Sequence, residues 1–389
     1  MNTDYILLGL FVALMLIFLL RNKKRVQMQK MLFPLLYFVM YRTKLGLKWM
    51  DDLAKRFPRF LHHFYYVGIY ICFLGMVFIC WQIIKLSIDL ILKPSMPPAI
   101  QLVLPIEAKG IFYIPFSYWI ISIFIIAVVH EFSHGVASRV YKIPVKSSGF
   151  AFLGIIFPVV PAAFVEPDEK RLLKTDWKKQ IAVFAAGPLA NIVLAFLLII
   201  GSFALVPLTN VFFEKGILLA SVDSEGPSFK AGLGAGDIIT SLNNQKVNSL
   251  KDFRAISAKL KENEEVLVNS LKPDGTIKEH KVTLIKKDNK VIFGIGISNT
   301  PAFNFALVNK IGSWASASFL WFLKLYELLI MLNLGIGLFN LLPIGPVDGG
   351  RMFSALIGRT IPSHSKKICS YVTSAFLMIL IVHVVKAFV

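Results

Sequence analysis

Residues 121–135 read ISIFIIAVVHEFSHG, an almost unbroken apolar run that ends in two histidines and a glutamate. In a helix, His130 and His134 lie one turn apart on the same face, with Glu131 beside them. An ionisable side chain deep in a membrane span costs about 3 kcal/mol on insertion scales, so such residues are functional candidates. Two imidazoles at this spacing can bind one metal ion while the glutamate acts as a general base. The alternative is that the cluster marks the wetted mouth of a helix.

The composition predicts a polytopic membrane protein that is mostly α-helical. Of the 389 residues, 56% are apolar, whereas soluble domains contain about 45–50%. The first apolar stretch lacks the basic segment and small-residue cleavage site of a signal peptide, so we interpret it as a retained anchor. About six stretches are long or apolar enough to span a bilayer, namely residues 5–20, 67–92, 112–134, 181–206, 312–342 and 371–389.

The distribution of charge predicts the orientation of these spans. The formal net charge is +19, and the nearly neutral loops 93–113 and 207–310 alternate with basic ones. Residues 21–63 contain 11 Lys or Arg against 2 acids, residues 139–179 contain 8 against 4, and residues 351–367 contain 4 against none. By the positive-inside rule the basic loops are cytoplasmic, which places both termini outside the cytoplasm. No soluble segment is strongly basic, so we expect no nucleic-acid partner.

Two further segments are apolar but unsuited to a continuous transmembrane helix. In residues 21–63 the apolar runs are short and basic residues recur, so we expect this segment at the cytoplasmic interface of the lipid bilayer. Residues 144–167 contain two glycines and four prolines, which disfavour a helix. Strand-like backbone at membrane depth survives only where protein or a water-filled cavity covers it. We therefore predict a re-entrant β-like segment beside the site.

A soluble, strand-rich insertion follows the fourth span, and we delimit it as residues 208–300. Residues 225–247, EGPSFKAGLGAGDIITSLNNQKV, resemble the PDZ domain, in which AGL, GD and a paired-Asn turn precede a single helix. The resemblance implies that an extended peptide or C-terminal stub adds to a sheet edge. By this resemblance Gly216, Ile217 and Leu218 occupy the peptide-binding loop. The alternative is a β-rich spacer that binds nothing.

A third metal ligand is available at the end of the fifth span. Residues 339–351 read FNLLPIGPVDGGR and contain Asp348. The charge-derived topology brings both HEFSH and Asp348 toward the cytoplasmic ends of their spans, so they meet at one depth. A zinc site with three protein ligands keeps a fourth position for water. Taken alone, the Pro-x-Asp-Gly-Gly stretch would be interpreted as a turn.

Five ordered motifs resemble the site-2 protease family of intramembrane zinc metalloproteases. They are HEFSHG, SSGFAFLGIIFP with AFVE, GPLAN, FNLLP and VDGGR. The resemblance covers roughly residues 112–356, and the first 110 residues are less diagnostic. It implies one zinc ion held by His130, His134 and Asp348, with Glu131 as the catalytic base that activates water for attack on a peptide carbonyl.

The resemblance also raises the question of how a transmembrane substrate is held. Its carbonyls are locked in helical hydrogen bonds, so the substrate must unwind locally. We expect the segment from around Gly149 to Val165 to offer strand pairing to the unwound substrate, with Gly149 and Phe150 among the substrate-binding residues. The family's core asparagines correspond to Asn191 and Asn340, which would supply side-chain hydrogen bonds. Their alternative role is interhelical packing.

The sequence therefore predicts four segments. Residues 1–64 form an anchor and a basic interfacial segment, residues 65–207 and 301–389 form the two parts of a membrane protease core, and residues 208–300 form the PDZ domain. The expected substrate is a membrane protein with one or a few spans, cut in a multi-pass enzyme of a prokaryotic cell membrane whose PDZ domain is extracytoplasmic. The alternatives are a catalytically silent scaffold or chaperone that binds peptides through the PDZ groove, and a metal transporter. A transporter would favour several polar spans along one path, whereas only two spans carry ligands here.

Overall fold

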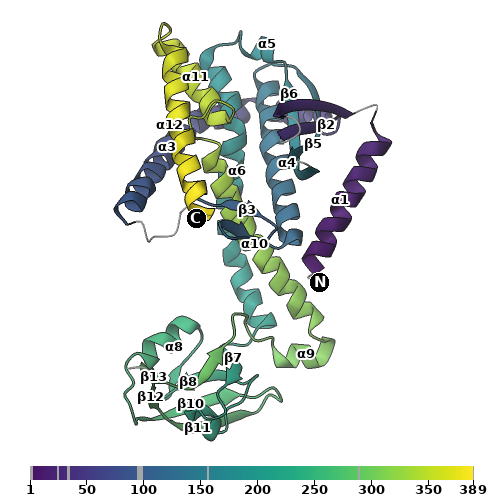
Figure 1. Ribbon diagram of the computed structural model, residues 1–389. Helices are drawn as coiled ribbons and strands as arrows, with labels where there is room; N and C mark the ends of the chain where they lie inside the picture. The colour runs from purple at the N-terminus through teal and green to yellow at the C-terminus, as the bar shows by residue number, and fades with distance from the viewer. Residues whose placement is uncertain are drawn as a thin grey trace. The chain divides into compact units, whose positions relative to one another are not determined.

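The computed structural model describes residues 3–23, 26–32, 36–93, 100–155, 157–287 and 290–388 (Figure 1). Within these ranges, six helices are long and apolar enough to cross a membrane. The prediction of a mostly helical, polytopic protein is thereby confirmed. These helices are α1 Thr3–Arg21, α3 Pro58–Leu92, α4 Phe116–Val140, α6 Trp177–Phe212, α10 Trp314–Phe339 and α12 Ser365–Phe388. The last residue of the predicted sixth span, Val389, lies outside the described residues, as do residues 1–2, 24–25, 33–35, 94–99, 156 and 288–289 within other predicted segments.

The helices differ from the predicted spans mainly at their ends. Helix α3 begins at Pro58 rather than residue 67, and α6 runs from Trp177 to Phe212 rather than over 181–206. Helix α4 continues to Val140, so HEFSH lies inside the helix and not at its end. Hydropathy locates only the part of a helix that matches the hydrocarbon core, whereas backbone hydrogen bonding continues through the polar residues beyond it.

The chain divides into two compact units. Unit 1 comprises Met1–Ile199 and Leu325–Val389, and unit 2 comprises Ile200–Lys324. The core of unit 1 packs residues of α3, α4 and α6 together with Leu341, which follows α10. Close packing in this core uses small residues, as is usual between membrane helices. A side chain at Gly68 of α3, for example, would overlap Leu189 of α6.

Unit 1 also contains an antiparallel sheet that includes the predicted re-entrant segment. Its four described strands are β1 Val26–Leu32, β2 Leu36–Thr43, β5 Val145–Ile155 and β6 Phe157–Pro167, in the order β1-β2-β5-β6. The prediction of strand-like backbone over 144–167 is confirmed. The strands at 26–43 were not predicted, because residues 21–63 were expected to form an interfacial segment. Within that segment, the helix α2, Leu47–Arg56, has the expected amphipathic character. The remaining short elements of unit 1 are β3 Leu102–Leu104, β4 Ile111–Tyr113, α5 Glu169–Leu172 and α11 Asp348–Thr360.

The sheet order corrects one predicted substrate contact. Gly149 lies on the inner strand β5 and pairs with Arg42 on one side and Phe164 on the other. Its backbone is therefore unavailable to a substrate strand, so Gly149 itself cannot offer the predicted pairing, and only the β6 part of the predicted segment 149–165 lies at an edge of the sheet. The glycine is needed because a Cβ there would overlap the carbonyl oxygen of Tyr41. Among the described strands, the edge nearest α4 is β6, which makes extensive contact with that helix.

Unit 2 is built around a second sheet with the order β11-β10-β8-β7-β14. Apolar side chains from the strands and Phe253 of α8 form its core. The strands are β7 Ile217–Val222, β8 Ile238–Leu242, β9 Gln245–Lys246, β10 Glu265–Leu271, β11 Ile277–Thr283, β12 Ile285–Lys287, β13 Lys290–Ile292 and β14 Ile295–Ile297. The helices that begin and end in this unit are α7 Pro227–Lys230, α8 Leu250–Ser257 and α9 Phe305–Ile311.

The predicted peptide-binding loop at Gly216, Ile217 and Leu218 also needs correction. Ile217 and Leu218 pair with β8, and the Leu218 carbonyl accepts a hydrogen bond from the Ser298 amide on the other side. An added peptide strand therefore finds no free edge there. The open groove in this unit instead lies between β14 and α8 and has a volume of about 860 Å³.

Candidate metal centre

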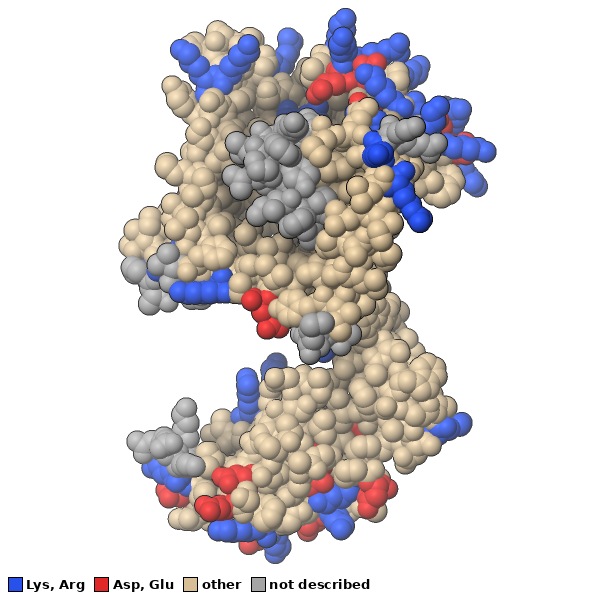
Figure 2. All heavy atoms as spheres, turned by 45° about the vertical axis from the view of Figure 1, so that its right-hand side comes forward, with Lys and Arg blue, Asp and Glu red and all other residues tan. Residues whose placement is uncertain are grey.

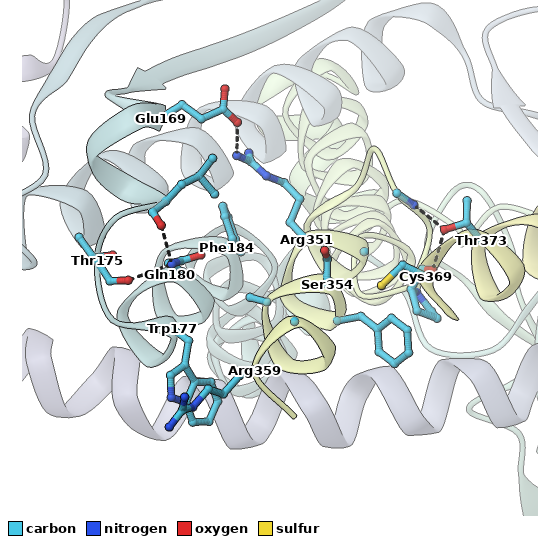
Figure 3. Close-up of a pocket in the computed structure, with 17 residues that line it drawn as sticks. Glu169, Thr175, Trp177, Gln180, Phe184, Arg351, Ser354, Arg359, Cys369 and Thr373 are labelled. Carbon is cyan, nitrogen blue, oxygen red and sulfur yellow. Dashed lines mark hydrogen bonds and ion pairs between the residues drawn. The ribbon is translucent and has the colours of Figure 1, made fainter. Parts of the chain in front are cut away.

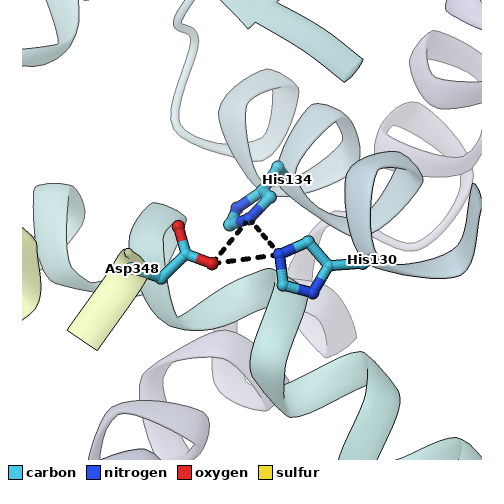
Figure 4. A group of neighbouring side chains, drawn as sticks. All are labelled: His130, His134 and Asp348. Atoms are coloured by element: carbon cyan, nitrogen blue, oxygen red, sulfur yellow. Dashed lines mark hydrogen bonds and ion pairs between the residues drawn. The ribbon is translucent and has the colours of Figure 1, made fainter. Parts of the chain in front are cut away.

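Three predicted ligands meet at one point in unit 1 (Figure 4). Asp348 Oδ2 lies 3.0 Å from His130 Nε2 and 3.3 Å from His134 Nε2. The two Nε2 atoms are 3.1 Å apart, and all three potential ligand atoms fall within 4.8 Å of one another. Two imidazoles and one carboxylate form a donor set that suits zinc and keeps a fourth position open. The residues present therefore fit a divalent metal ion.

Asp348 reaches the histidines because the chain folds back after α10. The amide of Gly349 donates to the carbonyl oxygen of Asn340 at 2.7 Å, which closes a turn and starts α11 at Asp348. A side chain at Gly349 would overlap the backbone of Leu341, and one at Gly350 that of Ile344. The two glycines of the DGG stretch therefore allow the close backbone packing that holds the carboxylate.

His134 is oriented by a backbone carbonyl of α6. Its Nδ1 lies 2.7 Å from the carbonyl oxygen of Val183. A carbonyl oxygen only accepts hydrogen bonds, so Nδ1 carries the proton and Nε2 directs its lone pair toward the other ligands. This is the tautomer that a metal ligand requires.

Glu131 lies beside the ligands and is held by the sheet. Its Oε2 accepts a hydrogen bond of 2.8 Å from the backbone amide of Val165 on β6. Glu131 also lines two cavities that contain metal-ligand residues. The position of the candidate base is therefore tied to the edge strand of the sheet.

Helix α6 approaches the ligands at Gly187. A Cβ at this position would lie 2.5 Å from His130 Nε2 and closer still to His134 Nε2. Any side chain here would occupy space that the two ligand nitrogens need. Gly187 therefore acts by having no side chain, a feature for which the sequence offers no direct signal beyond the GPLAN motif.

The two predicted asparagines occupy different places. Asn191 is fully buried and its side-chain amide lies 3.1 Å from His130 Nδ1. Asn340 makes no such contact among the described residues, although both asparagines are among the residues that line a cavity at the ligands. The structure thus brings both to the centre, but Asn191 contacts a ligand side chain directly.

Two cavities reach the metal centre, and they differ in the polarity of the residues that line them. One, of about 570 Å³, is lined by Glu131, His134 and Asp348 together with charged residues at its rim, namely Arg42, Glu166, Glu169 and Arg351. The other, of about 350 Å³, is lined by the ligands, by Glu131, by Asn191 and Asn340, and by apolar residues that include members of α4, β6 and α10. A third, almost purely apolar cavity of about 340 Å³ adjoins it and is lined in part by Phe150, so the predicted Phe150 side chain lies near the site.

Arg351 connects the start of α11 to two neighbouring elements (Figure 3). Its Nη2 donates to Glu169 Oε1 of α5 at 2.9 Å, and its guanidinium lies 4.3 Å from the ring centroid of Phe184 on α6. Since Asp348 is one turn away on the same helix, these contacts fix the helix that carries the carboxylate ligand. Sequence reasoning missed this residue because its partners lie far away in the chain.

A family model independently matches this part of the chain. The model of peptidase family M50 matches residues 118–380. The match includes both histidines, Glu131 and Asp348.

Sequence relatives cover larger and smaller shares of the chain. The uncharacterized protein MJ0971 of Methanocaldococcus jannaschii is 31% identical over 319 residues, which are 82% of this chain and 77% of that protein. The regulator of sigma-W protease RasP of Bacillus subtilis is 25% identical over 248 residues, or 53% of this chain and 58% of RasP. The zinc metalloprotease RasP of Shouchella clausii is 24% identical over 286 residues, or 58% of this chain and 65% of that one.

Among solved structures, PDZ domains of SdrC-like proteins match a short part of the chain. The domain from Listeria monocytogenes is 23% identical, covers 22% of this chain and 90% of its own, and has a TM-score of 0.21. The domain from Listeria innocua is 26% identical, covers 22% of this chain and 96% of its own, and has a TM-score of 0.20.

Substitution of Gly187 by Ala should weaken metal binding. The added Cβ overlaps both ligand nitrogens, so at least one imidazole must move. We expect the affinity for Zn²⁺, measured by competition with a chromophoric chelator, to fall at least about tenfold. Gly335→Ala on α10 is the matched control, because a Cβ there meets none of the described atoms within 4 Å. Equal affinities of the Gly187→Ala variant and the unmodified protein would contradict the close approach of α6.

Substitution of Arg351 by Ala should weaken Zn²⁺ binding a few-fold without abolishing it. The variant loses the contacts that fix α11, but the ion pair is largely solvent-exposed and contributes little by itself. Arg359→Ala is the control. Arg359 lines the cavity drawn in Figure 3, which Arg351 also lines, but it lies in the last turn of α11, away from Asp348. Equal losses in the two variants would indicate a general effect of charge rather than a fixed helix.

Proposed function

We propose that this metalloprotease hydrolyses a peptide bond within or near a transmembrane segment of another protein. The proposal starts from the family, because the chain belongs to peptidase family M50, the site-2 proteases. The observation that carries this proposal is that Asp348 of α11 meets His130 and His134 beside Glu131, on a helix, α4, that is long and apolar enough to span a bilayer. Ionisable residues at such depth are costly, and retaining four of them together requires a function.

Zinc is the cofactor, and His130, His134 and Asp348 would hold it. When bound, it supplies a polarised carbonyl and a water of lowered pKa. Glu131 takes a proton from the attacking water and returns it to the leaving amine. The Val165 amide fixes one carboxylate oxygen of Glu131, which keeps the base facing the ligands during both transfers.

The two cavities suggest separate routes for water and substrate. Charged residues at the rim of one cavity favour a path for water. The other cavity lies between the ligands and Pro161–Ala163 of β6, so an unwound substrate can extend along this strand edge. Asn340 can then donate to a substrate carbonyl, and Phe150 offers an apolar contact in the adjoining cavity.

The distribution of basic residues supports the proposed orientation of the protein in the membrane. In Figure 2, Lys and Arg side chains of unit 1 gather at the end that carries α5 and α11, beside a broad surface without charge. By the positive-inside rule this end is cytoplasmic, which gives the metal centre access to cytoplasmic water. The inserted domain and both termini are then extracytoplasmic. The organisms of the relatives favour a prokaryotic cell membrane.

Unit 2 would act in substrate selection. Its groove beside α8 and the edge strand β14 supports the proposal that an extended peptide adds to the sheet there. A peptide or C-terminal stub left by earlier trimming of a substrate's ectodomain is the expected ligand. A second candidate function, a silent scaffold that binds peptides through this groove, is less well supported because it leaves the metal centre without a purpose.

Substitution of Glu131 by Gln should abolish proteolysis and leave zinc binding intact. The amide oxygen can still accept from Val165, but it cannot take up a proton at neutral pH. We expect cleavage of single-span model substrates by the purified protein to fall by about 10²–10⁴, with unchanged zinc content. His134→Ala is the comparison and should lose both. Cleavage at the original rate would exclude Glu131 as the base, and a rate of zero in the unmodified protein would favour the scaffold.

A bulky residue in the groove of unit 2 should change substrate choice and not the chemistry. Ser257→Trp places an indole where α8 lines the groove. Ala255→Trp lies on the same helix but does not line the groove, so it serves as the control. We expect relative cleavage rates of substrates with different extracytoplasmic stubs to change several-fold only in the Ser257→Trp variant. An unchanged ranking would contradict selection through this groove.

A further inference from the structure

We propose that Asn191 is a positioning residue whose amide oxygen accepts a hydrogen bond from His130 Nδ1 and fixes the tautomer in which His130 can bind a metal. This assigns Asn191 to the metal centre instead of the substrate, where the sequence alone had put it. The inference rests on the proposed function only in assuming that the centre binds a divalent ion.

The position of Asn191 is closed to solvent and tightly packed. Asn191 is among the residues that line the cavity of about 350 Å³, but its side chain is 0% exposed and so offers no surface to a substrate backbone. On its other side, α10 comes so near that a Cβ at Gly337 would lie 3.2 Å from the Cβ of Asn191. The amide is thus held between α10 and His130.

In the present orientation of the Asn191 amide, its oxygen has no hydrogen-bond partner among the described residues. Asn191 Nδ2 faces His130 Nδ1 at 3.1 Å, while Oδ1 is buried without a hydrogen-bond partner among the described residues. The oxygen and nitrogen of a side-chain amide exchange places on a half-turn and are assigned from their hydrogen bonds. The partner of Nδ1 therefore depends on which ring nitrogen of His130 carries the proton.

Metal binding decides that question. His130 directs Nε2 toward Asp348 and His134, so Nε2 must offer its lone pair to the ion. A neutral imidazole then carries its proton on Nδ1, which becomes a donor. Only Oδ1 of Asn191 can accept from it, so the amide turns its oxygen to the ring.

The other histidine has an equivalent partner on the same helix. His134 Nδ1 lies 2.7 Å from the carbonyl oxygen of Val183. Val183, Gly187 and Asn191 follow one another at intervals of four residues and therefore share one face of α6. This face provides an acceptor for each ligand imidazole, with the glycine that leaves room for them in between. Such partners of the second ring nitrogen are a general feature of histidine metal sites.

The test compares two substitutions in the purified full-length protein. Asn191→Asp keeps an acceptor of the same shape, whereas Asn191→Leu removes it. By competition with a chromophoric chelator, we expect Leu to weaken Zn²⁺ binding about 10–100-fold and Asp to stay within about threefold of the unmodified protein. Asn333→Leu is the matched control. Asn333 is also a fully buried asparagine with an unpaired Oδ1 among the described residues, but its Nδ2 donates to Leu329.

Each outcome discriminates between roles of Asn191. Equal losses in the Asp and Leu variants would show that the amide donates to His130, and this would overturn the inference. Unchanged Zn²⁺ affinity in both variants, combined with a raised KM for a model substrate, would return Asn191 to substrate binding and also overturn it. The expected affinities in a protein that cleaves no substrate would support the inference and contradict the proposed proteolysis.

Discussion

The close approach of α6 to α4 at Gly187 is the constraint on which the metal centre depends. A single additional carbon at this position would enter the space of both ligand nitrogens. With only hydrogen there, α6 comes near enough for the Val183 carbonyl to reach His134 and for Asn191 to reach His130. The packing of α6 against α4 therefore also determines how the two ligand histidines are oriented. The tightly buried residues Ile181–Ala186 around it make this packing rigid, because close-packed interiors resist small displacements.

Two further elements complete the centre, and neither is a transmembrane helix. The turn closed between Gly349 and Asn340 brings Asp348 to the histidines, and the edge strand β6 holds Glu131 through the amide of Val165. The candidate base is consequently coupled to the same strand along which a substrate is proposed to lie. A substrate that shifts β6 would also shift the base, so binding and the readiness of the base are connected by one hydrogen bond.

The sequence was sufficient where the information is local. HEFSH specifies a helix face, the apolar stretches specify the spans, and the prolines and glycines of 144–167 exclude a helix there. It was insufficient where the answer depends on distant partners. The strand at 36–43 pairs with β1 nearby and also with β5 more than a hundred residues later, and the distant partner leaves no local signal. Sheet order, not composition, makes β6 and β14 edges and Gly149 and Leu218 inner residues. Val183 acts through its carbonyl and Gly187 through a missing side chain, so neither carries a chemical signature.

The arrangement explains how an apolar helix accommodates two histidines and a glutamate. Buried polar groups are costly mainly when they lack partners, and here each has at least one. His134 has the Val183 carbonyl, His130 has Asp348 and Asn191, and Glu131 has the Val165 amide. All of these partners come from α6, α11 or β6, so the polar face of α4 is covered by protein and turned away from lipid. A centre enclosed in this way can exchange water only through a cavity of its own, and the cavity with charged residues at its rim meets that need.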